Sequence, residues 1–131
     1  MKIIEVVAAI VINDDQILCT QRAESKLDYI SKKYEFPGGK VELNESHEEA
    51  LIREIKEELH MKVSVESHYL TVEHVYPDFK IIMDSYICHS KNRKLIMTEH
   101  LDALWLDINE LDSLDWAAAD IPIVEKLKGS K

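Results

Sequence analysis

Glycine, proline and cysteine are all scarce in this chain of 131 residues, which contains three glycines, three prolines and two cysteines. Disordered and collagen-like chains are much richer in glycine and proline, so their scarcity, with 46% hydrophobic residues, favours a folded globular protein. The two cysteines, Cys19 and Cys88, lie far apart in apolar stretches. They therefore predict buried free thiols, and a reducing, cytoplasmic setting, rather than a disulfide scaffold.

Long apolar runs and an excess of basic residues are also missing. No run approaches the ~20 apolar residues of a membrane span, so no membrane partner is expected. Sixteen Lys and Arg against 25 Asp and Glu leave a net charge of -9, which opposes binding to a nucleic-acid polymer. An acidic protein that acts on a small anion would need a cation to receive it. The length predicts one domain over residues 1–131.

The order of predicted elements indicates an α/β fold. Two Val- and Ile-rich runs around a polar turn predict a hairpin over residues 3–20. Alternating segments predict strands at 62–75 and 80–89, and shorter strands at 34–36 and 104–106. Helical patterns occur at 46–59, 109–111 and 121–127. Because strands and helices do not alternate regularly, a mixed sandwich is favoured over a doubly wound sheet.

The predicted helix at 46–59 has a well-marked start and two different faces. Ser46 and Glu49 have the spacing of a capping box. At about 100° per residue, the carboxylates of Glu54, Glu57 and Glu58 share one arc of the helix. The basic residues Arg53 and Lys56 lie off this arc. The predicted apolar stripe, on the other side, consists of Leu51, Ile52, Ile55 and Leu59. Small Ala50 is expected on the acidic side, leaving room above it. Such hard oxygen ligands suit Mg²⁺ or Mn²⁺; the alternative is a solvated acidic face.

Just before this helix, residues 37–40 read Pro-Gly-Gly-Lys and predict a tight turn where the backbone approaches a ligand closely. The alternative is a turn without any ligand. Turn, helix and carboxylates together are far more specific than each alone.

Residues 39–61 resemble a Nudix box, whose pattern is Gly, five residues, Glu, seven residues, Arg-Glu, an aliphatic residue, any residue, Glu-Glu, any residue, Gly and an aliphatic residue. The pattern is occupied in register by Gly39, Glu45, Arg53, Glu54, Ile55, Glu57, Glu58 and Met61. The single departure is His60, which stands where the family has glycine. That glycine caps the helix in a left-handed conformation, which His tolerates better than most residues, so a small stability cost is expected.

The likeness extends to residues 4–10 and 119–122, which are similar to the MutT-like branch and, within it, to its CTP pyrophosphohydrolase members. This resemblance implies an α/β/α sandwich with a mixed β-sheet. It also implies Mg-dependent hydrolysis of a nucleoside triphosphate to the monophosphate and pyrophosphate, with CTP, dCTP or a methylated or oxidised nucleotide as substrate.

The resemblance also assigns roles to residues of the box. It implies that Glu57 and Glu58 hold the metal, together with Glu54, which is also a candidate for orienting the water. The Gly38 carbonyl and Glu99, from a separate loop, would complete the metal shell, although an exposed loop acid is the alternative for Glu99. The implied catalytic set also includes Arg53, paired with Glu45 to hold the loop against the helix, and Gly39 has a structural role.

Candidate substrate contacts come from outside the helix. Arg22 and Lys40 are the expected phosphate contacts, with a solvated surface as the alternative. Asp120, just before the last helix, is either a base reader or a helix N-cap; an ionised carboxylate accepts hydrogen bonds only and so suits an amine such as cytosine N4. Phe36, Phe79 and Trp116 are candidates for stacking on the base or for the core.

Two other functions remain open at this point. The box is compatible with a nucleoside diphosphate sugar or a dinucleotide as substrate. The second open function is that of a Nudix-like domain that binds a nucleotide without hydrolysing it. Such domains usually lose one of the helix glutamates, whereas this chain has all three. The sequence leaves both a monomer and a homodimer possible.

Overall fold

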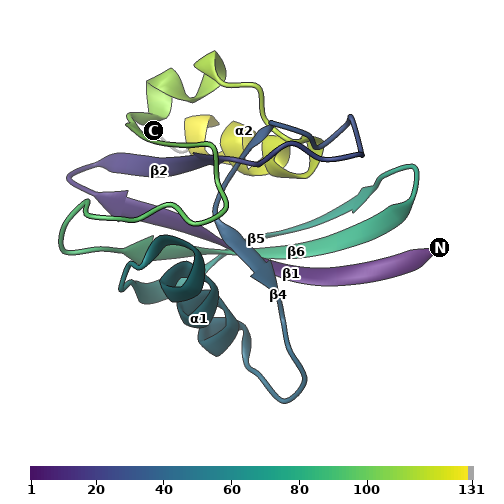
Figure 1. Cartoon of the computed structure of the whole chain (residues 1–131). Helices are drawn as coiled ribbons and strands as arrows, with labels where there is room; N and C mark the ends of the chain where they lie inside the picture. The colour runs from purple at the N-terminus through teal and green to yellow at the C-terminus, as the bar shows by residue number, and fades with distance from the viewer. Residues whose placement is uncertain (130–131) are drawn as a thin grey trace.

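The computed structural model describes residues 1–129 and contains a mixed β-sheet between two helices (Figure 1). The strands are β1 (Lys2–Asn13), β2 (Gln16–Gln21), β3 (Tyr34–Glu35), β4 (Gly38–Lys40), β5 (Ser64–Val75), β6 (Phe79–His89) and β7 (Asp102–Leu106). The helices are α1 (His47–Leu59), α2 (Ile121–Gly129) and two 3₁₀ turns, η1 (Ile108–Ser113) and η2 (Ala118–Asp120). Within this part of the chain, no helix has the length and apolarity needed to cross a membrane.

The sheet is mixed because β1 pairs in parallel with β6 and antiparallel with β2 and β4. The strand order is β3-β2-β1-β6-β5, with β4 also paired to β1 and β7 to β2. The predicted hairpin consists of β1, with 12 residues, and β2, with 6 residues. The two strands meet at a turn in which Asp14 and Asp15 adopt positive φ, the conformation that a two-residue hairpin turn requires.

The continuous apolar run of β1 is explained by helices on both faces of the sheet. Val7, Ala9 and Val11 pack with α1, whereas Ala8 and Ile10 pack with residues of α2. A strand covered on both faces loses the polar alternation of a half-exposed strand. The predicted α/β/α sandwich is confirmed (Figure 1).

Helix α1 follows the predicted boundaries closely. Ser46 caps it with the reciprocal hydrogen bonds of a capping box with Glu49. His60 ends it in the left-handed conformation, with φ of 54°, as expected for a residue in the glycine position. Two details of the predicted faces are wrong. Ala50 is fully buried in the core rather than on the acidic face, and Ile52 is 36% exposed rather than part of the apolar stripe.

The remaining elements differ from the predictions mainly at their ends. β5 begins at Ser64 rather than at residue 62, and β7 begins at Asp102 rather than at residue 104. The cysteines are free and buried, as predicted, and burial raises the pKa of each thiol to about 12.

Candidate active site

A cavity of about 850 Å³ lies on the face of the sheet that packs toward α2, is bordered by two glutamates of α1, and combines two chemically different parts. One part is polar and carries carboxylates from α1 and from the segment after β6; the other is apolar and reaches toward α2. The lining includes Ile4, Val6, Arg22, Glu35, Gly38, Gly39, Lys40, Glu54, Glu58, Tyr76, Phe79, Ile81, Met83, Glu99, His100 and Asp120. The fold thus joins residues from both ends of the chain.

The acidic face of α1 contributes two of its three carboxylates to the cavity lining. Glu54 and Glu58 line it and are largely buried, with side chains 15% and 20% exposed. Glu57 lies outside the lining, and its side chain is 59% exposed. The three glutamates therefore share a helix face, as predicted, but differ in their contact with water.

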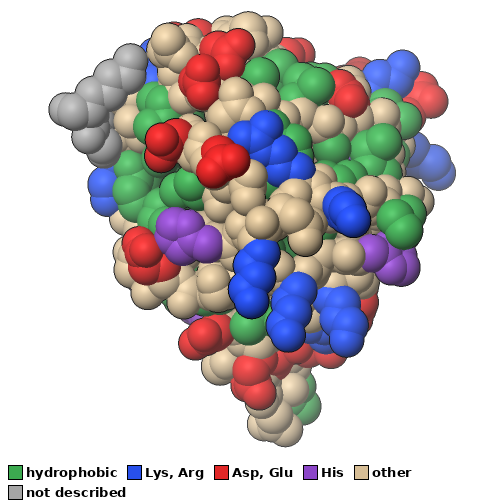
Figure 2. Space-filling view, turned by 90° about the vertical axis from the view of Figure 1, so that its left-hand side faces the viewer, with side chains coloured by type: hydrophobic (Ala, Val, Ile, Leu, Met, Phe, Trp, Pro, Cys, Tyr) green, Lys and Arg blue, Asp and Glu red, His purple; other side chains and the backbone are tan. Residues whose placement is uncertain are grey.

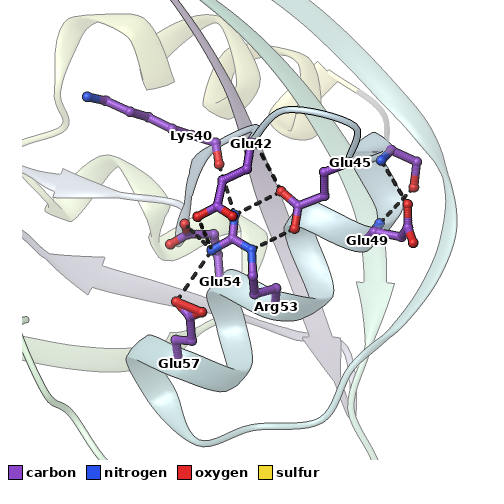
Figure 3. A network of polar contacts seen from close by, with 8 residues as sticks. Lys40, Glu42, Glu45, Glu49, Arg53, Glu54 and Glu57 are labelled. Carbon is purple, nitrogen blue, oxygen red and sulfur yellow. Dashed lines mark hydrogen bonds and ion pairs between the residues drawn. The ribbon is translucent and has the colours of Figure 1, made fainter.

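Arg53 lies beside the acidic arc on a helical wheel, as predicted, but its long side chain reaches across and bonds to the acidic face (Figure 3). Its Nη1 donates to Glu54 at 2.8 Å and to Glu57 at 3.4 Å. Its Nε and Nη2 donate to Glu45 at 2.6 and 2.9 Å, and Nη2 also reaches the Lys40 carbonyl at 3.1 Å. The hydrogen bonds from Arg53 lower the pKa of Glu45 to about 2. The predicted pair between Arg53 and Glu45 thus holds the loop before α1 against the helix.

The two glycines before α1 belong to strand β4, so the predicted tight turn is wrong. Gly38 and Gly39 pair with Ala8 and Val7 of β1, and neither adopts positive φ. A Cβ on Gly38 would lie 1.9 Å from the Val7 carbonyl oxygen, and one on Gly39 would lie 2.4 Å from the Glu54 carboxyl carbon. The glycines therefore permit close approach to a strand and to a site carboxylate.

Glu58 lies in a chain of charged side chains that continues to Arg22. His100 Nε2 lies 3.9 Å from Glu58 Oε2 and 3.4 Å from Glu35 Oε2, and Glu35 pairs with Arg22 at 2.9 Å. Burial, partly offset by His100, raises the pKa of Glu58 to about 7; nearby Glu54, Glu35 and Glu99 contribute to the rise. Glu99 itself is exposed at the cavity edge.

The candidate phosphate contacts line the cavity with different surroundings. Arg22 is paired with Glu35, and its side chain is 40% exposed. The Lys40 side chain is exposed and points away from the Arg53 network in Figure 3. Lys40 is thus the freer of the two cations.

The apolar part of the cavity ends at Asp120, which is only 4% exposed. Its Oδ1 accepts a hydrogen bond from the Phe36 backbone N–H at 3.1 Å, which ties the start of α2 to the segment after β3. Burial, reinforced by Glu35, raises the pKa of Asp120 well above its usual range. The Asp120 carboxylate therefore only accepts hydrogen bonds when it is ionised, as expected, whereas the protonated carboxyl group also donates one.

The aromatic candidates divide between core and cavity. Phe36 is 2% exposed and stacks on Trp116 with ring centroids 4.7 Å apart, so this pair belongs to the core, although Phe36 also borders the cavity. Phe79 is half-buried, lines the cavity and contacts the ring of Tyr76 at 5.2 Å. Phe79 is the better placed of the three for contact with a flat ligand.

The donor atoms at the polar end suit a hard divalent cation. Glu58 Oε2 is buried and has no hydrogen-bond partner in the described part of the chain, and such an atom is costly unless a ligand satisfies it. Carboxylate oxygens are the donors that Mg²⁺ and Mn²⁺ prefer. The Glu54 and Glu57 side chains are nevertheless turned toward Arg53. Within residues 1–129 no group of three or more His, Cys, Asp or Glu side chains is arranged to enclose a metal ion.

Comparison with known proteins gives the family of this site. The model of the NUDIX domain matches residues 6–126. The chain belongs to the Nudix hydrolase family. This Nudix hydrolase is 36% identical to a CTP pyrophosphohydrolase of Escherichia coli K12, over 95% of this chain and 91% of that protein. It is 29% identical to an 8-oxo-dGTP diphosphatase of the same organism, over 98% of each chain.

A solved structure agrees in fold. It is the solution structure of a MutT protein of the Nudix family from methicillin-resistant Staphylococcus aureus 252. This Nudix hydrolase is 43% identical to it, with complete coverage of both chains and a TM-score of 0.76. Enzymes of this family generally use a divalent metal ion, which agrees with the carboxylate donors at the cavity.

Sequence reasoning missed Glu35, Tyr76 and the side chain of His100. Glu35 and His100 link Arg22 to Glu58, and the Tyr76 hydroxyl accepts a hydrogen bond from the Ala119 N–H at 3.0 Å beside Asp120. The sequence signal that could have found two of them is their position next to predicted site residues: Glu35 precedes Phe36, and His100 follows Glu99. Only the pairing of distant segments shows that these residues share one cavity.

Proposed function

We propose that this Nudix hydrolase converts a nucleoside triphosphate, with CTP or dCTP the first candidates and methylated or oxidised nucleotides next, to the monophosphate and pyrophosphate. The observation that supports this is one cavity with carboxylates at one end and an apolar compartment with a buried polar group, Asp120, at the other. A triphosphate attached to a base needs both ends. The names of the relatives, a CTP pyrophosphohydrolase and an 8-oxo-dGTP diphosphatase, agree with this substrate class.

Mg²⁺, or Mn²⁺, is the proposed cofactor. Glu54, Glu57 and Glu58 would hold it, with the Gly38 carbonyl and Glu99 as further ligands. A bound divalent ion polarises phosphoryl oxygens and lowers the pKa of bound water. The chain itself supplies positioning: Arg53 holds Glu54, and Arg22 and Lys40 offer positive charge to phosphate. Because positioning and charge stabilisation dominate phosphoryl transfer, no covalent step by the protein is required.

A nucleoside diphosphate sugar or a dinucleotide is the second candidate, because the polar end alone would accept either. We propose a small-molecule partner in each case, in a cytoplasmic protein that acts as a monomer or homodimer. A screen of NTPs, dNTPs, oxidised and methylated forms, sugar nucleotides and dinucleotides with Mg²⁺ separates these candidates. Release of pyrophosphate from a triphosphate is the expected result; turnover of sugar nucleotides alone would favour the second.

The position of attack is the first prediction. In ¹⁸O-labelled water, we expect the label in pyrophosphate and not in the monophosphate, because the MutT-like resemblance implies attack at the β-phosphorus. Mass spectrometry of the products measures this. Label in the monophosphate would mean attack at the α-phosphorus, and release of orthophosphate would mean a different reaction.

The second prediction concerns base selection by Asp120. Ionised Asp120 would accept a hydrogen bond from cytosine N4, whereas uracil presents an oxygen at the same place. The Asn side chain can also donate a hydrogen bond. Asp120→Asn should therefore lower the ratio of kcat/KM for CTP to that for UTP, by a factor equivalent to about 1–3 kcal/mol. The metal requirement should not change.

Asp120→Ala is the control for the structural role of this side chain, because it removes the hydrogen bond to the Phe36 N–H. Thermal unfolding of both variants measures the loss of stability, and steady-state kinetics measures the ratio. If both variants are less stable but discriminate CTP from UTP like the original protein, Asp120 only ties α2 to the sheet.

A further inference from the structure

A second cavity, of about 440 Å³, lies away from the candidate active site, between the end of α1 and the end of β6. Its lining consists of His60, Met61, Lys62, Val63, Ser64, His89, Ser90, Lys91, Asn92 and Lys94. None of these residues lines the first cavity. Three lysines and two histidines, with no Asp or Glu, line it in a chain whose net charge is -9.

The two cavities therefore have opposite electrostatic character. The first is lined by seven carboxylates, those of Glu24, Glu35, Glu42, Glu54, Glu58, Glu99 and Asp120, and suits a cation. The second presents only potential cations and neutral groups. β6 ends on the side that faces the viewer in Figure 2, where several Lys and Arg side chains gather. A group of cations with no carboxylate in the same lining gives a local positive potential, which attracts an anion.

The loop that carries two of the lysines is held in place by hydrogen bonds of its own. Ser90 Oγ donates to the Asn92 carbonyl, and Asn92 Oδ1 accepts from the Lys94 N–H at 2.9 Å. Asn13 fastens the loop to the β1–β2 turn through the Ser90 carbonyl and the Arg93 guanidinium. A fixed loop loses little entropy when it binds a ligand, which favours affinity.

The lysines themselves are exposed and available. Lys62, Lys91 and Lys94 are exposed, and the ion pairs within residues 1–129 involve other cations. His89 pairs with Glu66 at 2.8 Å, which places one carboxylate near the rim. Lysine ammonium groups bind phosphate as point charges and need no fixed fork geometry.

We propose that this second cavity binds a small phosphorylated anion without a metal ion, at a site separate from catalysis. A metal-free mode follows from the lining, because it contains no carboxylate and the one near the rim, Glu66, is paired with His89. A small anion fits better than a nucleic-acid polymer, since the cavity is limited in size and the rest of the chain carries the negative charge.

Inorganic pyrophosphate is the probe, titrated in EDTA so that metal-dependent binding at the first cavity is removed. We expect amide NMR shifts in residues 60–64 and 89–94, with a Kd on the order of 1 mM or tighter. The double variant Lys62→Glu/Lys94→Glu should weaken this binding by about tenfold or more. Pyrophosphate should also raise the Tm of the original protein but not of the variant.

The matched control is Lys2→Glu/Lys32→Glu, which changes net charge equally at exposed residues outside both cavities. It should bind pyrophosphate like the original protein. An equal loss in this control would show a non-specific charge effect and overturn the proposal, as would the absence of shifts around the second cavity. Because no turnover is measured, failure of the proposed function would leave this result unaffected.

Discussion

Glu58→Gln is expected to reduce kcat by roughly 10²–10³-fold, the loss typical when one electrostatic stabiliser of a transition state is removed, and at the same time to stabilise the metal-free protein. Glu58 carries a buried carboxylate oxygen that has an ion pair with His100 at 3.9 Å but no hydrogen-bond partner among residues 1–129. Gln keeps the shape of the side chain but lacks the negative charge that a cation requires. Steady-state kinetics with Mg²⁺ and calorimetry of Mn²⁺ binding measure the first effect.

The gain in stability has a definite pH dependence. The pKa of Glu58 is about 7 in the folded protein against an ordinary value of 4.5, so the folded state holds the proton more tightly than the unfolded state. The cost of ionising Glu58 is absent below about pH 4.5, grows between 4.5 and 7, and is complete above. In EDTA at about pH 8, Glu58→Gln should therefore be more stable by on the order of 2 kcal/mol.

Glu57→Gln is the comparison that separates metal binding from burial. The Glu57 side chain is 59% exposed, so its replacement should also lose most turnover and weaken Mg²⁺ binding but without a comparable gain in stability. Near-normal turnover in both variants would contradict the assignment of this helix face to a metal ion. A Glu58→Gln protein that is less stable in EDTA at about pH 8 would contradict the cost assigned to burial.

The largest loss of stability is expected from Gly38→Ala, at about 3 kcal/mol or more. The new methyl group would overlap the Val7 carbonyl oxygen, which is backbone held in the β1–β4 ladder and cannot rotate away. Denaturant unfolding in EDTA measures the change. Strand β4 also joins α1 to the sheet, so we expect kcat to fall together with stability.

Two other glycines are the controls. In Gly39→Ala the methyl group meets the end of the Glu54 side chain, which can move, so we expect a smaller loss of stability with a clear loss of activity. Gly129→Ala meets nothing within 4 Å among residues 1–129 and should be neutral or slightly stabilising at the end of α2. Equal stability of Gly38→Ala and Gly129→Ala would show that β4 does not pack as described.

The sequence by itself determined most of the elements apart from β4, and it determined the chemistry of α1, because these depend on local patterns. The capping box at Ser46, the left-handed His60 and the shared face of the three glutamates follow from residues within one helix. The mixed sandwich was predicted from strands and helices that do not alternate regularly, and the structure explains the apolar run of β1 by a layer on each face.

Only the tertiary structure decided which carboxylates are buried, where Arg53 bonds and which distant residues share a cavity. Glu35, His100 and Asp120 come from three segments, and no local period relates them. The reach of a long side chain such as Arg53 also exceeds what a helical wheel records, so its bonds to Glu54 and Glu57 were not predicted. The tight turn predicted at Gly38 and Gly39 was wrong because a local pattern does not show a distant strand partner. Gly38 pairs with Ala8 of β1, which lies thirty residues earlier in the chain.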